Sequence, residues 1–209
     1  MQPLPVILFL LFVCFTSACD RKITSVSSNG VFSGRKNHSS ISVGNGGTWG
    51  QWTWVDMCPN RTYAIGFSIK VEEYGGQFSD DTSLNGIRLY CSTNQLLDGI
   101  TYTVESDSGT FGEWSNITWC PDGSFLNAFE LQVEPLLGNQ DETTVNNIRF
   151  RCSKGAVIET VGGRFGNYER WSEPCKKGAI CGLQTRQEQY KGYFADDTAL
   201  NDVLFYCCE

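Results

Sequence analysis

The sequence has few of the residues on which most catalytic and metal sites depend. It contains one histidine, His38, and no GxSxG, HExxH, Walker or CxxC motif. A Ser-His-Asp triad, a zinc site or a nucleotide-binding loop therefore cannot be assembled from it. Basic residues are also scarce, with 16 Lys and Arg against 23 Asp and Glu and a net charge of -7. That balance, without a basic stripe, argues against nucleic acid or anionic lipid as a partner. We expect no metal and no cofactor.

Long apolar runs are missing after the first 19 residues. Residues 1–19 carry no charged side chain, and an apolar core from Val6 to Phe15 precedes the small residues Thr16-Ser17-Ala18. This pattern predicts a secretory signal peptide over 1–19. No later segment reaches the roughly 20 apolar residues that a bilayer span requires, so we expect a secreted, extracellular protein. Residues 20–40 form a polar leader, in which we interpret His38 as solvated surface.

Three internal repeats fill the rest of the chain. The phrases GGTWGQW (46–52), SGTFGEW (108–114) and GGRFGNY (162–168) match one another. So do FSDDTSLNGIRLYC (78–91), GNQDETTVNNIRFRC (138–152) and FADDTALNDVLFYC (194–207). Chance similarity would not keep several landmarks in step through all three copies. We place the units at 41–91, 102–152 and 157–208, within a single domain over 41–209.

Apolar and polar residues alternate within each unit, which predicts β-strands. The inner face of a first strand comprises Tyr63, Ile65, Phe67, Ile69 and Val71 in unit one, Phe125, Phe129, Leu131 and Val133 in unit two, and Leu183, Thr185 and Gln187 in unit three. A second strand carries Ile87, Leu89 and Cys91, then Ile148, Phe150 and Cys152, then Val203, Phe205 and Cys207. The third inner face is the most polar. Because a short sheet cannot bury its apolar face alone, we expect one antiparallel sheet per unit and three sheets around a pseudo-threefold axis.

The cysteines follow the same repeat. It pairs Cys58 with Cys91, Cys120 with Cys152 and Cys175 with Cys207, and it leaves Cys181 for Cys208. Because neighbouring strand residues point to opposite faces, the swapped pairs Cys175–Cys208 and Cys181–Cys207 stay open. Each bridge closes a loop of about 30 residues and contributes about 3 kcal/mol in the chain-entropy model. Cys14 leaves with the signal peptide. Cleavage after Cys19 would remove that cysteine too, whereas cleavage before it would leave an odd thiol in the mature chain.

Three matched acidic pairs are the first candidates for chemistry: Asp80–Asp81, Asp141–Glu142 and Asp196–Asp197. A glycosidase needs two carboxyl groups that face each other across its substrate, and neighbours in a strand do not. We therefore interpret the pairs, with Asn85, Asn146 and Asn201 behind them, as turn chemistry. A carbohydrate or cation contact is the second interpretation, and catalysis is the third. The weak catalytic candidates are Asp81, Glu142, Asp197, Glu113 and Glu169.

Aromatic residues and glycines gather in the turn phrases. Five tryptophans are candidates for a platform on which sugar rings stack: Trp49, Trp52, Trp54, Trp114 and Trp171. Recurrence at matched positions first indicates packing, so Trp54, which does not recur, is a better ligand candidate than the repeated aromatics. We expect positive φ or close backbone approach at Gly47, Gly50, Gly109, Gly112, Gly163 and Gly166. Asn37, Asn60 and Asn116 are N-glycosylation acceptors.

Several phrases resemble the vitelline membrane outer layer protein 1 family. They are Cys58-Pro59, IGFSIKVE, DDTSLNGIRLYC, KKGAICGLQT and DDTALNDVLFYCCE, and the resemblance covers about residues 41–208. It implies a β-prism of three Greek-key sheets, disulfides within repeats, secretion and a place in the outer layer of an egg envelope. The chain departs from the family in the extra Ile180 and in its leader, which leaves tissue and partner open.

The sequence thus predicts an all-β, disulfide-stapled β-prism of three Greek-key antiparallel sheets with internal pseudo-threefold symmetry. We expect a secreted, non-catalytic structural or binding protein of an extracellular coat, whose partners are glycoproteins or oligosaccharides. Jacalin-type lectins support sugar binding by fold analogy alone. The alternative is a glycan-processing transferase or hydrolase acting on N-acetylglucosamine oligomers, a chemistry that the family resemblance suggests.

Overall fold

The computed structural model describes residues 23–25, 35, 38–73, 82–93, 101–135, 144–189 and 198–209. The predicted signal peptide, Asn37 and the three acidic pairs lie outside these ranges. The interpretations placed on them therefore remain predictions.

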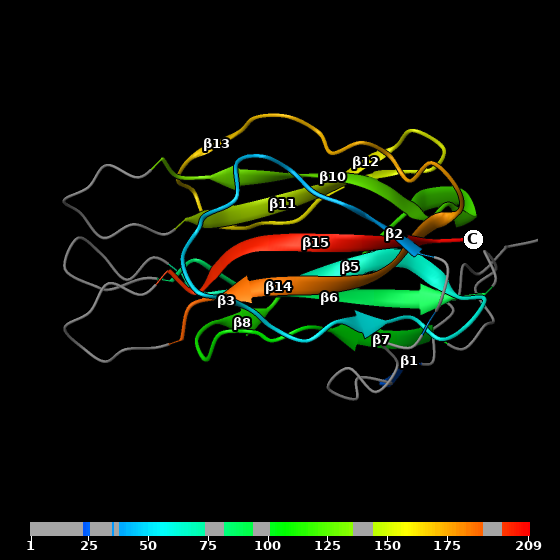
Figure 1. The fold of residues 1–209 in the computed structure, drawn as a ribbon, viewed down its shortest axis with the longest axis horizontal. Coiled ribbons are helices and arrows are strands. Elements are labelled where there is room, and N and C mark those ends of the chain that lie inside the picture. The colour runs from blue at the N-terminus through cyan, green and yellow to red at the C-terminus, as the bar shows by residue number, and fades with distance from the viewer. Residues whose placement is uncertain are drawn as a thin grey trace, which may run out of the picture.

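The described residues form three β-sheets (Figure 1). Sheet one has the strand order β1 (Ile23–Ser25), β7 (Thr101–Glu105), β6 (Leu84–Ser92), β5 (Tyr63–Val71) and β8 (Glu113–Trp114), and β9 (Thr118–Trp119) also pairs with β5. Sheet two has the order β12 (Val157–Glu159), β11 (Val145–Cys152), β10 (Leu126–Val133) and β13 (Asn167–Tyr168). Sheet three has the order β2 (His38–Ile41), β15 (Leu200–Cys208), β14 (Ala179–Gln187) and β3 (Gln51–Trp52), and β4 (Asp56–Met57) also pairs with β14. All pairs are antiparallel except β1 with β7.

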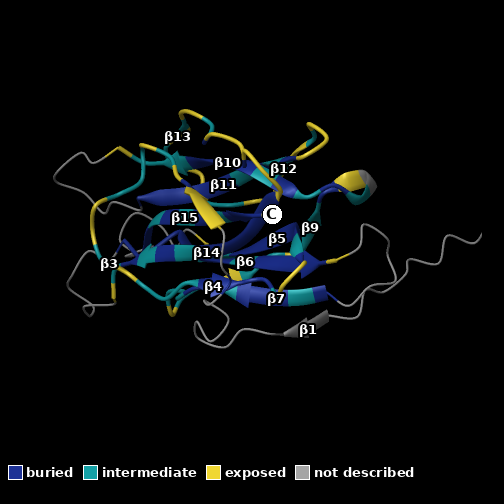
Figure 2. Ribbon diagram, turned by 45° about the vertical axis from the view of Figure 1, so that its right-hand side comes forward, coloured by how far each residue is buried: buried dark blue, intermediate teal, exposed yellow. Residues whose placement is uncertain are grey.

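A hairpin of two long strands forms the centre of each sheet, and the hairpins run along the long axis of the molecule (Figure 1). Both long strands of each hairpin carry the predicted alternation, and their inner faces are buried (Figure 2). All three hairpins contain a bulge at the same place, between Ala64 and Gly66 in β5 and at the matching positions of β10 and β14. The inner-face prediction fails before the bulge in two units for this reason. Tyr63 and Phe125 are half-buried, whereas Ala64 and Leu126 beside the bulge are fully buried.

The sheets do not coincide with the sequence repeats. Sheet one takes its central hairpin from unit one, but β7 and β8 come from residues 101–114, which open unit two. Sheet two is completed in the same way by β12 and β13. Sheet three joins the C-terminal hairpin β14–β15 to β3 and β4 from the start of unit one and to β2, which begins in the leader and ends at the first residue of that unit. Each turn phrase therefore ties its own unit to the sheet of the preceding one, and the third sheet closes the ring.

Four phenylalanines fill the centre where the three sheets meet. Phe67 comes from sheet one, Phe129 and Phe150 from sheet two, and Phe205 from sheet three, and all four are fully buried. The Phe129 and Phe205 ring centroids lie 4.7 Å apart, and those of Phe67 and Phe150 also lie 4.7 Å apart. Tilted and edge-to-face rings at this spacing are favourable beyond the area that they bury. The predicted triangular core is thus present, with aromatic rings on its axis.

The turn phrases lie at one end of the prism, which we call the turn end. Gly50, Gly112 and Gly166 have φ of 73°, 83° and 76°, and each packs against the backbone where β14, β5 or β10 ends. The other three predicted glycines have no room for a side chain, because Gly47, Gly109 and Gly163 lie against Asn201, Asn85 and Asn146. Both expectations for these glycines, positive φ and close approach, are met.

The disulfides gather at the opposite end, which we call the disulfide end. The structure contains Cys58–Cys91, Cys120–Cys152, Cys175–Cys207 and Cys181–Cys208. Of the two pairings left open for unit three, it therefore has the unswapped one. Arg35 from the leader closes this end, because its guanidinium donates hydrogen bonds to the carbonyls of Cys58, Pro59 and Thr62. Across the described ranges, no helix is long and apolar enough to cross a bilayer.

Candidate functional site

The described part of the acidic phrase is bonded into the end of each hairpin. Thr82 donates its amide and hydroxyl hydrogens to Glu72 Oε2, at 3.0 and 2.6 Å, and Asn85 Nδ2 donates to Thr82 Oγ1 at 2.6 Å. In unit three, Thr198 donates to Glu188 and Asn201 to Thr198 in the same way. The asparagines and threonines of this phrase therefore hold a turn in place, as the sequence suggests.

The residue after each threonine position has a backbone conformation that the sequence did not reveal. Ser83, Thr144 and Ala199 have φ of 53°, 40° and 43°, a region that favours glycine. Their carbonyls accept hydrogen bonds of 2.8 Å from Glu72 N, Glu134 N and Glu188 N. These bonds close each hairpin, so the strain is compensated within the turn.

The two acidic candidates that the structure describes belong to different sheets. Glu113 lies in β8 of sheet one, and Glu169 directly follows β13 of sheet two; both are exposed. Asp81, Glu142 and Asp197 lie outside the described residues. Within the described ranges, no group of three or more His, Cys, Asp and Glu side chains is arranged to hold a metal ion.

Two of the repeated aromatics are covered by arginines. The Arg88 guanidinium lies 3.9 Å from the Trp114 ring centroid and is held by Glu105 at 2.6 Å. In sheet two, Arg149 lies 4.2 Å from the Tyr168 ring and pairs with Glu130. Such stacking is a cation–π contact that also shields the ring face from other partners.

Two further tryptophan candidates are partly buried and bonded. The Trp54 indole donates to Glu105 O at 3.3 Å, and Arg151 lies 4.3 Å from the Trp171 ring. The geometry at Trp54 is that of packing between sheets, although this residue is absent from the repeat and looked the best ligand candidate in the sequence.

Sheet three lacks the covering arginine. Trp52 pairs with Arg186 across the ladder in the same way that Trp114 pairs with Lys70. On the second long strand, however, sheet three carries Leu204 at the position where sheets one and two carry Arg88 and Arg149. Trp52 is accordingly 39% exposed, and Trp49 in the same turn phrase is 51% exposed. We call Trp49 and Trp52 the tryptophan surface. The sequence names both residues and shows leucine in place of the arginine, but only the aligned ladders show that this position matches the arginines that cover Trp114 and Tyr168.

Asp202 lies beside this surface on β15. Its neighbour across the ladder is Arg186, its Oδ1 accepts the Val203 amide at 2.8 Å, and its carboxyl group packs against Gly46. Burial raises the pKa of Asp202 from its ordinary value of 3.8 to about 6. The hydrogen bond from Val203 and the charge of Arg186 lower the pKa, but by less than burial raises it. The matching residues of the other sheets are uncharged, Gly86 and Asn147.

We expect Asp202→Asn to stabilise the protein at about pH 7.5 but not near pH 3.5. A carboxyl group with a raised pKa in the folded state binds its proton more tightly there than in the unfolded chain, so wild-type stability is lost as pH rises from about 4 through about 6. Melting temperatures across this range measure the effect, and Glu113→Gln, at an exposed carboxylate, is the control. Equal shifts at both pH values would contradict the assignment.

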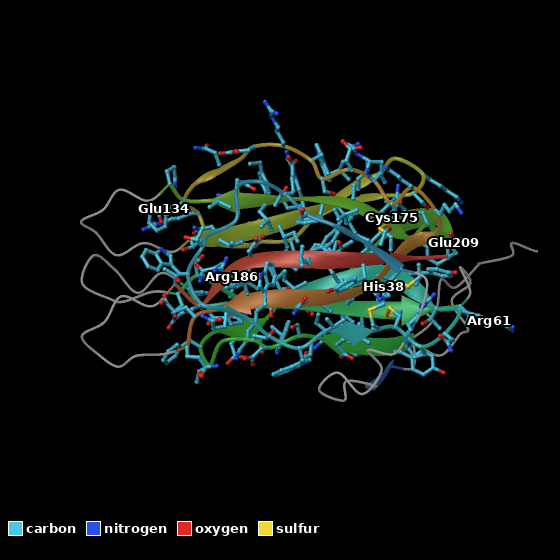
Figure 3. All side chains as sticks on the ribbon, in the orientation of Figure 1. His38, Arg61, Glu134, Cys175, Arg186 and Glu209 are labelled. Atoms are coloured by element: carbon cyan, nitrogen blue, oxygen red, sulfur yellow. A yellow bond between two sulfur atoms is a disulfide. The ribbon has the colours of Figure 1, made fainter. Side chains whose placement is uncertain are left out.

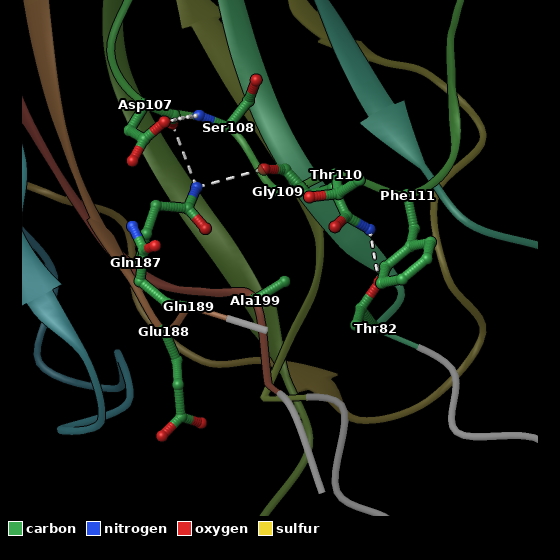
Figure 4. A pocket seen from close by; sticks show the side chains of 11 residues that line it. Thr82, Asp107, Ser108, Gly109, Thr110, Phe111, Gln187, Glu188, Gln189 and Ala199 are labelled. Carbon is green, nitrogen blue, oxygen red and sulfur yellow. Dashed lines mark hydrogen bonds between the residues drawn. The ribbon is translucent and has the colours of Figure 1, made fainter. Parts of the chain in front are cut away.

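A pocket of about 160 Å³ lies at the turn end, at the seam between sheets one and three. We call it the seam pocket. Its lining includes Thr82, Asn85, Asp107, Gly109, Phe111 and Gln187 (Figure 4). Side-chain amides, hydroxyls and one aromatic ring dominate this lining, which therefore offers hydrogen bonds rather than a purely apolar cavity. The sequence does not predict this pocket, although the polar inner face of unit three, which includes Gln187, is a feature from which it could have been suspected.

A wider groove of about 780 Å³ occupies the disulfide end, and its lining includes Arg35, His38, Arg61, Lys176 and Lys177. Figure 3 shows His38, Arg61 and Glu209 at this end, opposite Glu134 and Arg186. Glu209 also lines the groove and forms a salt bridge of 3.0 Å with Lys177. His38 is exposed, as the sequence suggested, and its ring meets the edge of Tyr206 with centroids 5.0 Å apart. The acceptors Asn60 and Asn116 are exposed.

Comparison with known proteins places this geometry in a family. Residues 39–209 match the family model described as Vitelline membrane outer layer protein I (VOMI). The chain is 51% identical over 170 residues to the vitelline membrane outer layer protein 1 homolog of Mus musculus, a match that covers 81% of this chain and 83% of the relative. It is 48% identical over 176 residues to the Homo sapiens homolog, which covers 84% and 86% of the two chains. Among solved structures, a mannose-binding lectin from champedak matches 82% of this chain and 98% of its own with a TM-score of 0.50 and 15% identity, a likeness of fold alone. The chain belongs to the vitelline membrane outer layer protein 1 family.

Proposed function

We propose that this protein is a secreted, non-catalytic component of an extracellular coat, and that it binds glycans through the tryptophan surface of sheet three. One observation carries the proposal: Trp49 and Trp52 are exposed where the equivalent rings of sheets one and two are covered or half-buried. An indole face is flat, rigid and apolar, and it suits the C–H face of a sugar ring. The names of the mouse and human relatives refer to a membrane layer outside the egg, which agrees with such a role.

The structural setting of the surface suits a coat protein. The tryptophans stand at the turn end, while the four disulfides stiffen the other end. A shallow stacking surface gives weak binding to a single sugar, but many copies fixed in one layer act together through multivalency. A stiff prism also reduces the entropy lost on binding, because its contact residues are already ordered. The mannose binding named for the champedak lectin shows that a related fold can carry a sugar site, and it adds no residue-level support.

We expect Leu204→Arg to weaken glycan binding at least tenfold, or about 1.4 kcal/mol, without unfolding the protein. The new guanidinium would stack on Trp52 as Arg88 stacks on Trp114 and so occupy the sugar face. Trp52→Ala should weaken binding to a similar extent by removing the ring. The measurement is retention of the secreted, enzymatically deglycosylated protein on a glycan array, followed by titration of the best glycan.

Val157→Arg is the matched control, because it adds the same charge in place of an apolar side chain on sheet two, at an exposed position. It should bind as the wild type does. The proposal fails if Leu204→Arg and Trp52→Ala bind normally, or if the control loses as much affinity. Incubation with N-acetylglucosamine oligomers should yield no new products; products that disappear in the Asp81→Asn or Asp197→Asn variant would favour the glycan-processing alternative.

A further inference from the structure

One strand of the prism, β14, carries polar residues at two positions where the matching strands β5 and β10 are apolar. Gln187 ends β14 where Val71 ends β5 and Val133 ends β10. Two residues earlier, Thr185 stands where the other sheets have Ile69 and Leu131. Gln187 is 4% exposed and Thr185 is fully buried. Polar side chains have therefore replaced apolar ones at two inner-face positions of β14, while Leu183 on the same face stays in the apolar core.

Most of the polar atoms introduced by this change are satisfied. Thr185 Oγ1 donates to Asp107 O at 2.8 Å, and Thr185 N donates to Ser106 Oγ at 3.1 Å. Ser106 Oγ also donates to Trp54 O at 2.6 Å and bonds to Thr53 Oγ1 at 2.6 Å. This network ties the segment after β7 to sheet three. It stabilises the seam without any help from the oxygen of Gln187.

The oxygen of the Gln187 amide is the exception. Its Nε2 donates to Asn85 O and Asp107 O, both at 3.1 Å, which fixes the amide orientation. Its Oε1 is buried and has no hydrogen-bond partner among the described residues. Leaving a buried acceptor unpaired costs free energy. Both carbonyls already have another donor, because Gly109 N reaches Asn85 O at 2.7 Å and Thr185 Oγ1 reaches Asp107 O. The glutamine is thus not needed to satisfy its neighbours.

Gln187 belongs to the lining of the seam pocket, and so does Asn85, whose Oδ1 is likewise buried without a hydrogen-bond partner among the described residues. Figure 4 shows the Gln187 amide extending into the pocket between the 107–109 segment and Ala199. The pocket volume of about 160 Å³ corresponds to about five water molecules, a space that suits a single sugar ring better than an oligosaccharide. Phe111 supplies an apolar wall. Asp107 and Glu188 also line the pocket and disfavour an anion.

We propose that the seam pocket is a second binding site, which takes one uncharged sugar ring with a hydroxyl or amide N–H group donating to Gln187 Oε1. A sugar ring matches both parts of the lining, since its hydroxyls donate to Gln187 and Asp107 while its C–H face packs on Phe111. The pocket shares with the proposed function the expectation of a carbohydrate ligand, but it uses residues of sheets one and three outside the tryptophan surface. A buried acceptor without a partner, at a position where the other two sheets carry valine, costs stability locally, and such local costs are typical of functional sites.

The test is an NMR titration of the amide signals of Ser108, Gly109 and Thr110 with glucose, mannose, galactose and N-acetylglucosamine, each to about 100 mM, a hundredfold above a Kd of about 1 mM. We expect at least one sugar to shift these signals in the wild type, and glucuronate to shift none of them. Gln187→Val should weaken binding at least tenfold while melting at no lower temperature than the wild type without ligand. If the valine variant does not fold, Gln187→Met provides the same test with the side-chain length kept.

Trp52→Ala separates this site from the proposed function. It should weaken binding on the glycan array at least tenfold and leave the monosaccharide shifts unchanged. The inference is overturned if no sugar of the panel moves the three amide signals, if Gln187→Val binds as tightly as the wild type, or if Trp52→Ala removes the shifts.

Discussion

Replacing Phe205 with alanine is expected to lower the free energy of unfolding by about 3–5 kcal/mol. The ring is fully buried on the axis of the prism and contacts rings of sheet two, with centroids 4.7 Å from Phe129 and 5.2 Å from Phe150. Removing the ring leaves a cavity between sheet three and sheet two. Movement of one sheet alone would not fill this cavity, because its walls belong to more than one sheet. Urea unfolding of the oxidised protein measures the loss.

Phe125→Ala is the matched control for this prediction. Phe125 is half-buried before β10 and meets only the edge of Tyr63, with centroids 5.4 Å apart, among the aromatic contacts of the described residues. We expect its removal to cost clearly less than that of Phe205. Equal losses in the two variants would show that the axial cluster has no special place in the stability of the fold.

Gly112→Ala is expected to cost about 2–5 kcal/mol, the sum of about 1–2 kcal/mol for a left-handed residue and about 1–3 kcal/mol for overpacking. Its φ is 83°, and an added Cβ would lie 2.5 Å from the Glu72 amide nitrogen and even closer to the Val71 carbonyl group. The backbone at this corner cannot retreat without breaking the pairing of β8 with β5. Thermal unfolding of the oxidised protein measures the effect.

Gly155→Ala separates the two contributions. Gly155 also has a positive φ, 92°, but an added Cβ would meet nothing within 4 Å. It should therefore show the backbone cost of about 1–2 kcal/mol alone. If the two variants lose the same stability, close packing at the turn end is not what fixes glycine at position 112.

The repeat made the fold predictable. The inner faces, the turn glycines and one cysteine pair of each unit recur three times in the sequence, so three copies indicate the same local structure. Gly50, Gly112 and Gly166 illustrate this, since all three take a positive φ against the end of a neighbouring strand. A single copy of the phrase would not distinguish a corner glycine from a flexible one.

The connection between units was not predictable from the repeats. A repeat gives the period of a structure but not the point at which one sheet ends and the next begins. β8 pairs with β5 of the preceding unit, and β3 of unit one pairs with β14 of unit three. Each sheet therefore combines the long hairpin of one unit with short strands of another. Only contacts between residues far apart in the chain reveal this arrangement.

The candidate site depended on departures from the repeat, which the sequence shows only in part. Leu204 in place of an arginine, and Gln187 in place of a valine, are visible as letters, but their meaning needs the ladder that sets Trp52 beside Leu204 and the pocket that holds Gln187. Trp54 shows the opposite case. It is unique in sequence, yet its indole is bonded to the backbone of Glu105.

The closure of sheet three by β2, β3 and β4 imposes an order on biosynthesis. These strands are made first, yet their partners are β14 and β15, which emerge from the ribosome only after the intervening residues 63–168 have supplied the other two sheets. The early segment must wait without a partner while the chain grows, because its hydrogen-bonding edge does not yet exist. The growing chain is thus a prism that stays open along one side until its final hairpin arrives.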